Sequence, residues 1–153
     1  MKFEREIPVK ASVDVFVAGG GPAGIAAALS ASRAGASVYL AEREQCFGGM
    51  ATAAMVPAFM RFSDGINFLS GGVGREVFNA LYGEDADYTP IEFAFDIEKL
   101  KRVYDAMLKN STVNYSFENH IISVECDEGK ITHAIIMGKE KLFAVEAKIF
   151  IDT

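Results

Sequence analysis

Residues 19–24 read Gly-Gly-Gly-Pro-Ala-Gly, and this stretch decides the fold. It follows an apolar run, 13–18, that has the length and β-branched content of a buried strand. An alanine-rich segment, 25–34, comes next and predicts a helix that ends at a glycine. A second apolar run, 36–41, ends in the acid Glu42. Strand, glycine turn, helix, strand and acid follow one another in the order of a dinucleotide-binding fingerprint.

Each residue of the glycine turn has a physical role in this interpretation. Gly19 allows the tight turn out of the strand, and Gly24 lets the helix pack closely on that strand. Gly21 lacks a Cβ, so a pyrophosphate can approach the main chain. Pro22 occupies a first helical turn, where its missing N–H is tolerated. Together with Ala23, these residues are the predicted binding site for a diphosphate at the positive end of a helix dipole.

Glu42 ends the second strand, 18 residues after Gly24. Its carboxylate is expected to accept hydrogen bonds from the hydroxyls of a ribose. Because its charge repels a ribose 2′-phosphate, a ligand of the NADP type is disfavoured. The neighbouring Arg43 is a further candidate for cofactor binding. The alternative, a glycine-rich loop in an ordinary α/β fold, explains the loop but not the whole order of elements.

A second glycine motif bears on the choice between FAD and NAD, which the fingerprint alone does not make. The motif is Gly48-Gly49-Met50-Ala51-Thr52. Its small residues leave the main chain open to a large ligand, and the Thr52 hydroxyl is suited to bond a phosphate or a flavin edge. The motif resembles the glycine doublet of FAD-dependent oxidoreductases with a glutathione-reductase-like fold, in particular a group that carries a Gly-Gly-Met-Ala-Thr loop. The alternative is a flexible turn between a strand and a helix.

The resemblance covers nearly the whole chain and implies its fold. The fold class is α/β, a Rossmann-like parallel sheet with flanking helices and an antiparallel β-meander, truncated at its C-terminus. One domain, 1–153, is then the N-terminal portion of an FAD-binding domain. Within it, an irregular segment, 53–95, faces the flavin or substrate, and the meander spans 118–147. Ile121 is a main-chain contact candidate beside the adenine ring.

The end of the sequence departs from the family pattern. Residues 149–153 resemble the strand that precedes a second flavin-binding turn, which continues Thr-Gly-Asp-Gly in the family. Its Asp binds the ribityl chain of the flavin. This sequence stops at Thr153, so one wall of the FAD site is expected to be missing, and association with itself or with a partner chain is expected.

Local signals predict the other elements. A polar lead-in is expected over 1–11 and a short helix near 75–82. Asp96 is a good N-cap for a helix whose apolar residues recur at helical spacing through Leu108. A strand at 113–117 follows, and two turn signals divide the next region into three short strands before a separate parallel strand at 147–151.

Composition limits the classes of function. The chain has 153 residues, of which 50% are hydrophobic, enough to build the core of one domain. Its net charge of −6 argues against a nucleic-acid partner or an anionic membrane surface. No apolar run reaches membrane-spanning length, and the first residues lack the apolar core of a signal peptide, so a cytoplasmic protein is expected.

Few side chains suggest chemistry of their own. Cys46 lacks the second nearby cysteine of a flavin disulfide reductase, and a small buried thiol is the favoured interpretation. His120 and His133 are isolated, so no metal site is predicted. Aromatic residues at 59–64 fit a core better than a site. The sequence identifies neither a catalytic residue nor a substrate.

Three functions remain open from the sequence. The leading hypothesis is the FAD-binding portion of a flavin-dependent oxidoreductase, incomplete and inactive alone. The second is an NAD-binding dehydrogenase domain, which the fingerprint permits. The third is a non-catalytic fragment or split subunit. Purified protein that is yellow and releases FAD would favour the first, colourless protein that retains NAD the second, and protein that binds neither the third.

Overall fold

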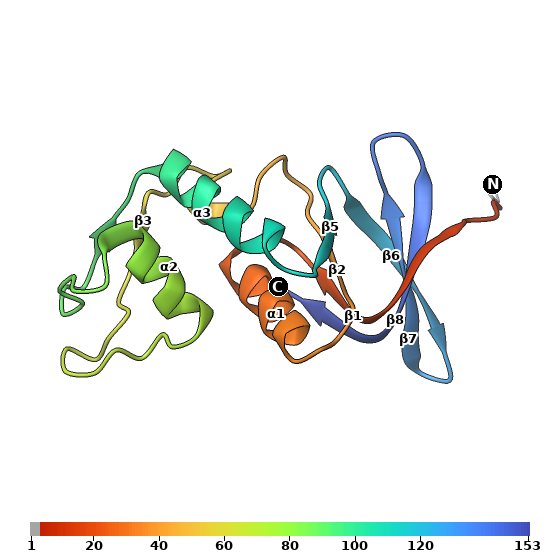
Figure 1. Ribbon diagram of the computed structural model, residues 1–153. Coiled ribbons are helices and arrows are strands. Elements are labelled where there is room, and N and C mark those ends of the chain that lie inside the picture. The colour runs from red at the N-terminus through yellow and green to blue at the C-terminus, as the bar shows by residue number, and fades with distance from the viewer. Residues whose placement is uncertain (1–3) are drawn as a thin grey trace.

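A computed structural model of this chain describes residues 4–153 (Figure 1). The first three residues of the predicted polar lead-in lie outside the described residues. The elements in chain order are β1 (Val9–Ala18), α1 (Pro22–Arg33), β2 (Val38–Ala41), the 3₁₀ helix η1 (Gly49–Ala51), β3 (Ala58–Phe59), α2 (Val73–Tyr82), β4 (Phe93–Ala94), α3 (Ile97–Lys109), β5 (Asn114–Ser116), β6 (His120–Asp127), β7 (Lys130–Met137) and β8 (Leu142–Asp152).

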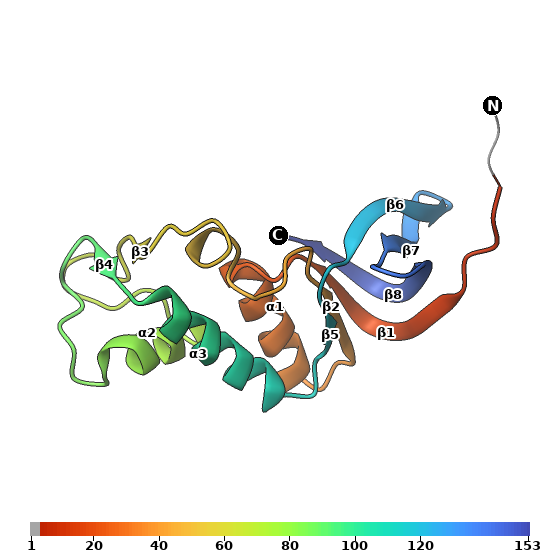
Figure 2. The same ribbon diagram turned by 90° about the horizontal axis from the view of Figure 1, so that it is seen from above.

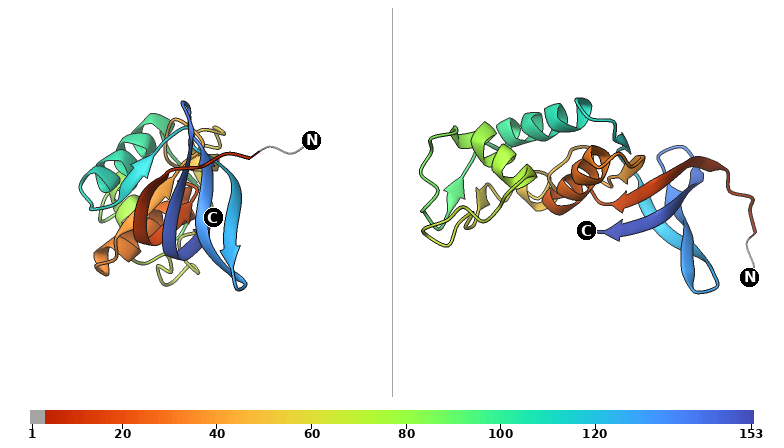
Figure 3. Two further views of the ribbon diagram at one scale, coloured as in Figure 1. Left: turned by 90° about the vertical axis from the view of Figure 1, so that its right-hand side faces the viewer. Right: turned by 60° about the horizontal axis from the view of Figure 1, so that its bottom comes forward.

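A six-stranded sheet organises the molecule, with the strand order β5-β2-β1-β8-β7-β6. The pairs β5–β2, β2–β1 and β1–β8 are parallel, whereas β8–β7 and β7–β6 are antiparallel. The predicted α/β class, with a Rossmann-like parallel sheet and a meander, is confirmed. The strands lie side by side when the molecule is viewed from its right-hand end (Figure 3, left).

Strand β8 corrects one detail of the sequence-based prediction. The third meander strand and the separate parallel strand at 147–151 are one continuous strand, Leu142–Asp152. Its first half pairs with β7, and the strand pairs with β1 from Ala144 to Asp152. The reason is visible in the sequence, because no glycine, proline or asparagine interrupts residues 142–152. The parallel partner also draws Val9 and Ala11 into β1, so part of the expected lead-in is strand.

The two faces of the parallel strands bury different partners. Val15 and Val17 of β1 pack with the helices in one core cluster. Phe16, between them in sequence, points to the opposite face and packs with Tyr39 and with β7 residues such as Ile136. This alternation follows from the pleat of a strand. Seen from above, α1 and α3 lie on one side of the parallel strands and the meander on the other (Figure 2).

Residues 53–95 form a lobe beside the sheet, at the left of Figure 1. The lobe contains α2 and the short β3–β4 pair, joined by chain without regular secondary structure. Its own core is aromatic, built around Phe62, Phe78 and Phe93. Arg33 at the end of α1 forms a bidentate ion pair with Glu76 of α2, which joins the lobe to the part of the chain that contains the sheet.

Helix α3 begins where the sequence predicts. The Asp96 carboxylate accepts a hydrogen bond from the main-chain N–H of Lys99 at 2.7 Å, so the predicted N-cap is confirmed. Leu100, Tyr104 and Leu108 form its buried face. Within residues 4–153, none of the helices combines the length and the apolar character needed to cross a membrane.

Candidate functional site

A cleft of about 1070 Å³ opens at the carboxyl ends of the parallel strands. In open α/β sheets, ligands bind at these strand ends. The end of β8 lies beside α1 there (Figure 3, right), with the Thr153 side chain close to Gly24. The cleft is lined by the glycine turn, the end of β2, the loop after β2, the meander and the end of β8. The lining residues are Phe16, Ala18, Gly19, Gly21, Pro22, Ala23, Ala41, Glu42, Arg43, Glu44, Gly49, Met50, Ala53, Ala54, Asn119, His120, Ile121, Val124, Ile131, Ala134, Phe150, Ile151, Asp152 and Thr153.

The glycine turn is close-packed at Gly19 and Gly24. Gly19 has a φ of +102°, a conformation that residues with a side chain rarely adopt. A Cβ at Gly24 would overlap the carbonyl oxygen of Gly19. Thr153 packs against the same point, and its hydroxyl donates to Ala18 O at 2.9 Å. The structure thus shows the close helix–strand approach that the sequence assigns to Gly24, and Gly24 lies behind the cleft.

Gly21 has the opposite surroundings. A Cβ built at Gly21 would meet nothing within 4 Å, so the main chain there is open to an approaching group. Gly21 is the N-cap of α1, Pro22 follows in the first turn, and no side chain caps the helix. Main-chain N–H groups of a helix N-terminus attract anions through hydrogen bonds and the helix dipole. This end of the cleft is therefore suited to a diphosphate.

Glu42 lines the cleft and is only 5% exposed. Its Oε2 accepts a hydrogen bond from the main-chain N–H of Gly20 at 2.5 Å, and its Oε1 accepts one from the N–H of Glu44 at 2.6 Å. The acid at the end of β2 is thus next to the glycine turn, as the fingerprint predicts. The sequence analysis did not predict that Glu42 would accept hydrogen bonds from both the glycine turn and the loop after β2.

The loop after β2 exposes only part of the second glycine motif to the cleft. Gly49 and Met50 line the cleft, whereas Gly48, Ala51 and Thr52 lie behind it. Thr52 is 1% exposed, and its hydroxyl donates to Phe47 O at 2.5 Å. The structure does not support the expected contact of this hydroxyl with a phosphate or flavin edge. The hydroxyl proton is instead donated to Phe47 O within the loop.

The motif is an ordered turn rather than an unstructured one. Gly48 has a φ of +108° and Gly49 a φ of +50°, which explains why glycine is needed at both positions. The loop continues as the 3₁₀ helix η1, with the N–H of Ala51 donating to Gly48 O. A Cβ at Gly49 would come within 3.3 Å of the Cα of Gly21, so the two glycine motifs are neighbours across the cleft.

The other end of the cleft is mostly apolar. Ile121, the candidate contact for an adenine ring, lines this end, and Val124 and Ile131 extend the surface. The sequence-based prediction missed Phe16 and Phe150, which also line the cleft. The alternation of side chains along a strand could have indicated Phe16, because it places Phe16 on the opposite face from Val15 and Val17. Arg43 lines the cleft with an exposed side chain that pairs with Glu44 at 2.9 Å.

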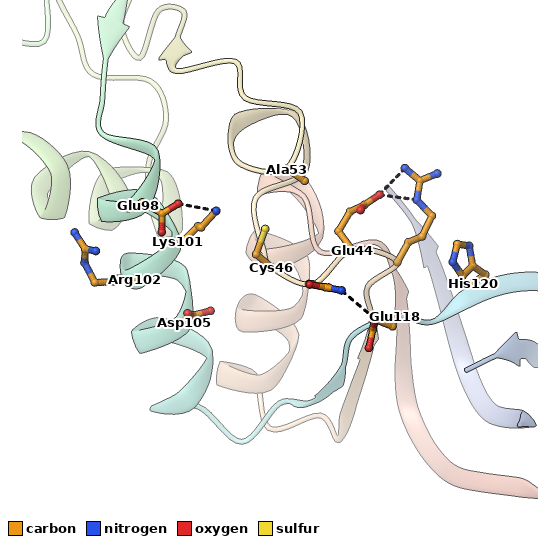
Figure 4. A pocket seen from close by; sticks show the side chains of 11 residues that line it. Glu44, Cys46, Ala53, Glu98, Lys101, Arg102, Asp105, Glu118 and His120 are labelled. Carbon is orange, nitrogen blue, oxygen red and sulfur yellow. Dashed lines mark hydrogen bonds and ion pairs between the residues drawn. The ribbon is translucent and has the colours of Figure 1, made fainter. Parts of the chain in front are cut away.

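A second, polar groove of about 660 Å³ lies between α3, the loop that carries Arg43 and the start of β6 at His120 (Figure 4). It shares Arg43, Glu44, Ala53 and His120 with the cleft. Its charges largely pair with one another: Lys101 contacts Glu98 at 2.7 Å, which raises the pKa of Lys101. Cys46 lines this groove, half-buried, with its Sγ 3.8 Å from the Thr52 hydroxyl oxygen.

Comparison with known proteins gives one family. The sequence model of the family described as FAD dependent oxidoreductase matches residues 14–153. That span includes every residue predicted to bind the cofactor. None of the curated proteins compared with this chain matches it.

Solved structures show the same fold at low sequence identity. A geranylgeranyl bacteriochlorophyll reductase-like protein from Thermoplasma acidophilum has a TM-score of 0.66 and 19% identity, over 94% of this chain and 39% of that chain. THI4 from Thermovibrio ammonificans has a TM-score of 0.64 and 18% identity, over 93% and 57%. The 3-ketosteroid-delta4-(5alpha)-dehydrogenase from Rhodococcus jostii RHA1 has a TM-score of 0.65 and 17% identity, over 92% and 45%. The chain therefore spans roughly 39% to 57% of the length of these structures.

Proposed function

This chain belongs to the FAD dependent oxidoreductase family, and from that premise we propose which of its residues hold the cofactor. The cofactor is FAD, and the chain is an FAD-binding portion of a flavin-dependent oxidoreductase. The family match favours FAD over the NAD alternative that the fingerprint left open. When bound, FAD supplies hydride or electron transfer, and the protein supplies binding and orientation.

The observation that carries the residue assignment is the open main chain at Gly21. In the proposal, the diphosphate of FAD lies over Gly21, Pro22 and Ala23, where α1 begins without a side-chain cap. The space where a Gly21 Cβ would stand is free of protein atoms, as a cradle for a phosphate requires. Gly19 and Gly24 shape the turn from behind.

We assign the adenosine to the end of the cleft that holds Glu42, Arg43 and Ile121. The Glu42 oxygens already accept one main-chain N–H each, and a carboxylate has further lone pairs for the ribose hydroxyls. The apolar surface at Ile121 suits the face of an adenine ring. The flavin half then extends past Gly49 and Met50, which border the same cleft.

Hydrogen–deuterium exchange tests the assignment directly. FAD added to the protein should slow amide exchange within residues 19–24 and 42–50, since these segments line the cleft or hold it. Exchange in α2, whose residues do not line the cleft, is the internal control. Protection confined to other segments, with FAD bound, would show that the cofactor lies elsewhere.

The substrate, the partners and the location are further parts of the proposal. We propose that the chain acts on a small molecule, binds no nucleic acid and associates with itself or with a partner chain. Exposed apolar side chains on the meander and β8, such as Ile122 and Ile149, support association.

Cys46 and Cys126 are free thiols, which suits a cytoplasmic location. Light scattering tests the proposed association, and cell fractionation tests the proposed location.

A further inference from the structure

Asn119 lies in the connection between β5 and β6, and it lines the cleft. The proposed cofactor site does not yet use its side chain, although the residue is only 4% exposed. Buried polar side chains normally have hydrogen-bond partners, because an unpaired buried group costs free energy. The partners of the Asn119 amide therefore bear on what this part of the cleft binds.

Only one side of the Asn119 amide is occupied. Its Nδ2 donates to Phe117 O at 2.7 Å, and this bond fixes the orientation of the amide, since only the nitrogen can donate to a carbonyl oxygen. The amide oxygen, Oδ1, accepts no hydrogen bond from any of residues 4–153. A Cβ at Gly138 would come within 3.2 Å of Oδ1, so the lack of a side chain at Gly138 keeps the oxygen uncovered on that side. Asn119 thus brings an unused acceptor to the cleft.

Main-chain hydrogen bonds hold Asn119 between the acid of the glycine fingerprint and the apolar end of the cleft. The N–H of Asn119 donates to Glu42 O at 3.0 Å, and the N–H of Glu118 donates to Glu44 O at 3.3 Å. Glu118 has a φ of +56°, a conformation that persists only where the surrounding structure holds it. Ile121, the candidate contact for an adenine ring, follows two residues after Asn119. The acceptor is therefore fixed at the end of the cleft that we assign to the adenosine.

We propose that Asn119 Oδ1 accepts a hydrogen bond from the amino group of the adenine of FAD and makes the cleft selective for adenine. The inference rests on the proposed function, because that proposal puts the adenosine at this end of the cleft. Adenine carries an amino donor at C6, whereas guanine and hypoxanthine carry a carbonyl oxygen there. Two acceptors that face each other both stay unpaired, so a site built to pair the amino group rejects bases that lack it.

The test compares ADP with IDP, which share the diphosphate and the ribose and differ in the base. Each is titrated by calorimetry into the ligand-free full-length protein. The wild type should bind ADP about tenfold more tightly than IDP, as one base-specific hydrogen bond allows. Asn119→Ala should bring the two dissociation constants to within about twofold of each other, because no acceptor then reads the base. A purely structural role would weaken both nucleotides alike and leave their ratio unchanged.

Two further variants isolate the acceptor. Asn119→Asp keeps an oxygen acceptor but cannot donate to Phe117 O, so it should retain the preference for ADP even if the fold is less stable. Asn114→Ala is the matched control, because Asn114 is an exposed residue of β5 that does not line the cleft. It should keep the wild-type ratio. Circular dichroism verifies the fold of each variant.

Three results would overturn the inference while leaving the proposed function intact in a wild type that binds FAD. The first is equal binding of ADP and IDP by the wild type. The second is an Asn119→Ala protein that keeps the wild-type preference, since main-chain groups would then read the base. The third is loss of the preference in a folded Asn119→Asp protein. Failure of the wild type to bind FAD would instead overturn the proposed function.

Discussion

The main-chain N–H of Gly20 donates to the carboxylate of Glu42 at 2.5 Å, which joins the glycine turn to the end of β2. The second carboxylate oxygen accepts the N–H of Glu44. One buried acid therefore shapes both the turn proposed to bind the diphosphate and the loop proposed to lie beside the ribose. In the proposed function, the shape of the cleft and the binding of the cofactor consequently depend on the same side chain.

Gly21→Val should abolish FAD binding without unfolding the protein. The backbone of Gly21 has a φ of −68°, which any residue adopts, and the space around its Cβ position is free. The added side chain would stand where the diphosphate approaches. Gly71→Val is the control, because Gly71 also has free space and lies outside the cleft. Equilibrium dialysis with FAD, with circular dichroism to verify the fold, measures both. Wild-type affinity in a folded Gly21→Val protein would contradict the diphosphate assignment.

Glu42→Ala should weaken FAD binding by about one to two decades, since a charged hydrogen bond is worth roughly 1.5–3 kcal/mol. It should also lower the free energy of unfolding by about 1–3 kcal/mol, because the N–H groups of Gly20 and Glu44 lose their acceptor. Titration calorimetry and urea unfolding measure the two effects. A variant with normal stability and normal FAD affinity would show that neither role is correct.

Thr52→Val should destabilise the fold, and Thr52→Ser should not. Valine has the shape of threonine but cannot donate to Phe47 O, which leaves a buried acceptor unpaired at a cost of about 1–3 kcal/mol. Serine retains the hydroxyl. Urea unfolding of the three proteins provides the comparison. Equal stabilities, together with a loss of FAD affinity in Thr52→Val, would instead restore the direct ligand contact predicted from the sequence.

Asp14 gives the fold a predictable dependence on pH. The ammonium of Lys148 donates to it at 2.6 Å and Ser37 donates through its hydroxyl and N–H, so the pKa of Asp14 lies well below its ordinary 3.8. The unfolded chain therefore binds a proton first, and this contribution to stability is present above about pH 4 and is lost as the pH falls toward the folded-state pKa.

Asp14→Asn should thus be less stable than the wild type at pH 7, and the difference should shrink at pH 3. Lys148→Met removes the largest cause of the shift and should reproduce part of the effect. The difference in stability between each variant and the wild type is measured from urea midpoints at the two pH values. Low ionic strength is used because salt screens exposed charges. Parallel loss of stability in Asp14→Asn and wild type would contradict this role for Asp14.

The sequence predicted the parallel core and the glycine turn because each element there has a strong local signal. Gly19, Pro22 and Glu42 occupy fixed places in one strand-helix-strand unit, and Asp96 marks the start of α3. The continuous strand β8 was missed, since only its first half pairs with the neighbouring strand β7, whereas its longer pairing is with β1, which is far away in sequence. Pairing of that kind depends on the tertiary fold.

Within the candidate site, the directions of side chains were harder to predict than their positions. Thr52 is in the predicted loop, but it faces the core at Phe47 and not the cleft. Phe150 lines the cleft although no local signal distinguishes it from Ile149. These outcomes depend on which face of a loop or strand is covered by distant elements, such as the meander.

Competition between FAD and NAD tests the central claim most directly. Both cofactors are titrated into one ligand-free preparation of the full-length protein, with Gly21→Val beside it to report binding outside the cleft. We expect FAD to displace NAD and to bind only where Gly21 is intact, because the cleft borders both glycine motifs and belongs to a member of the FAD dependent oxidoreductase family. Preferential binding of NAD, or FAD binding that survives Gly21→Val, would contradict the account.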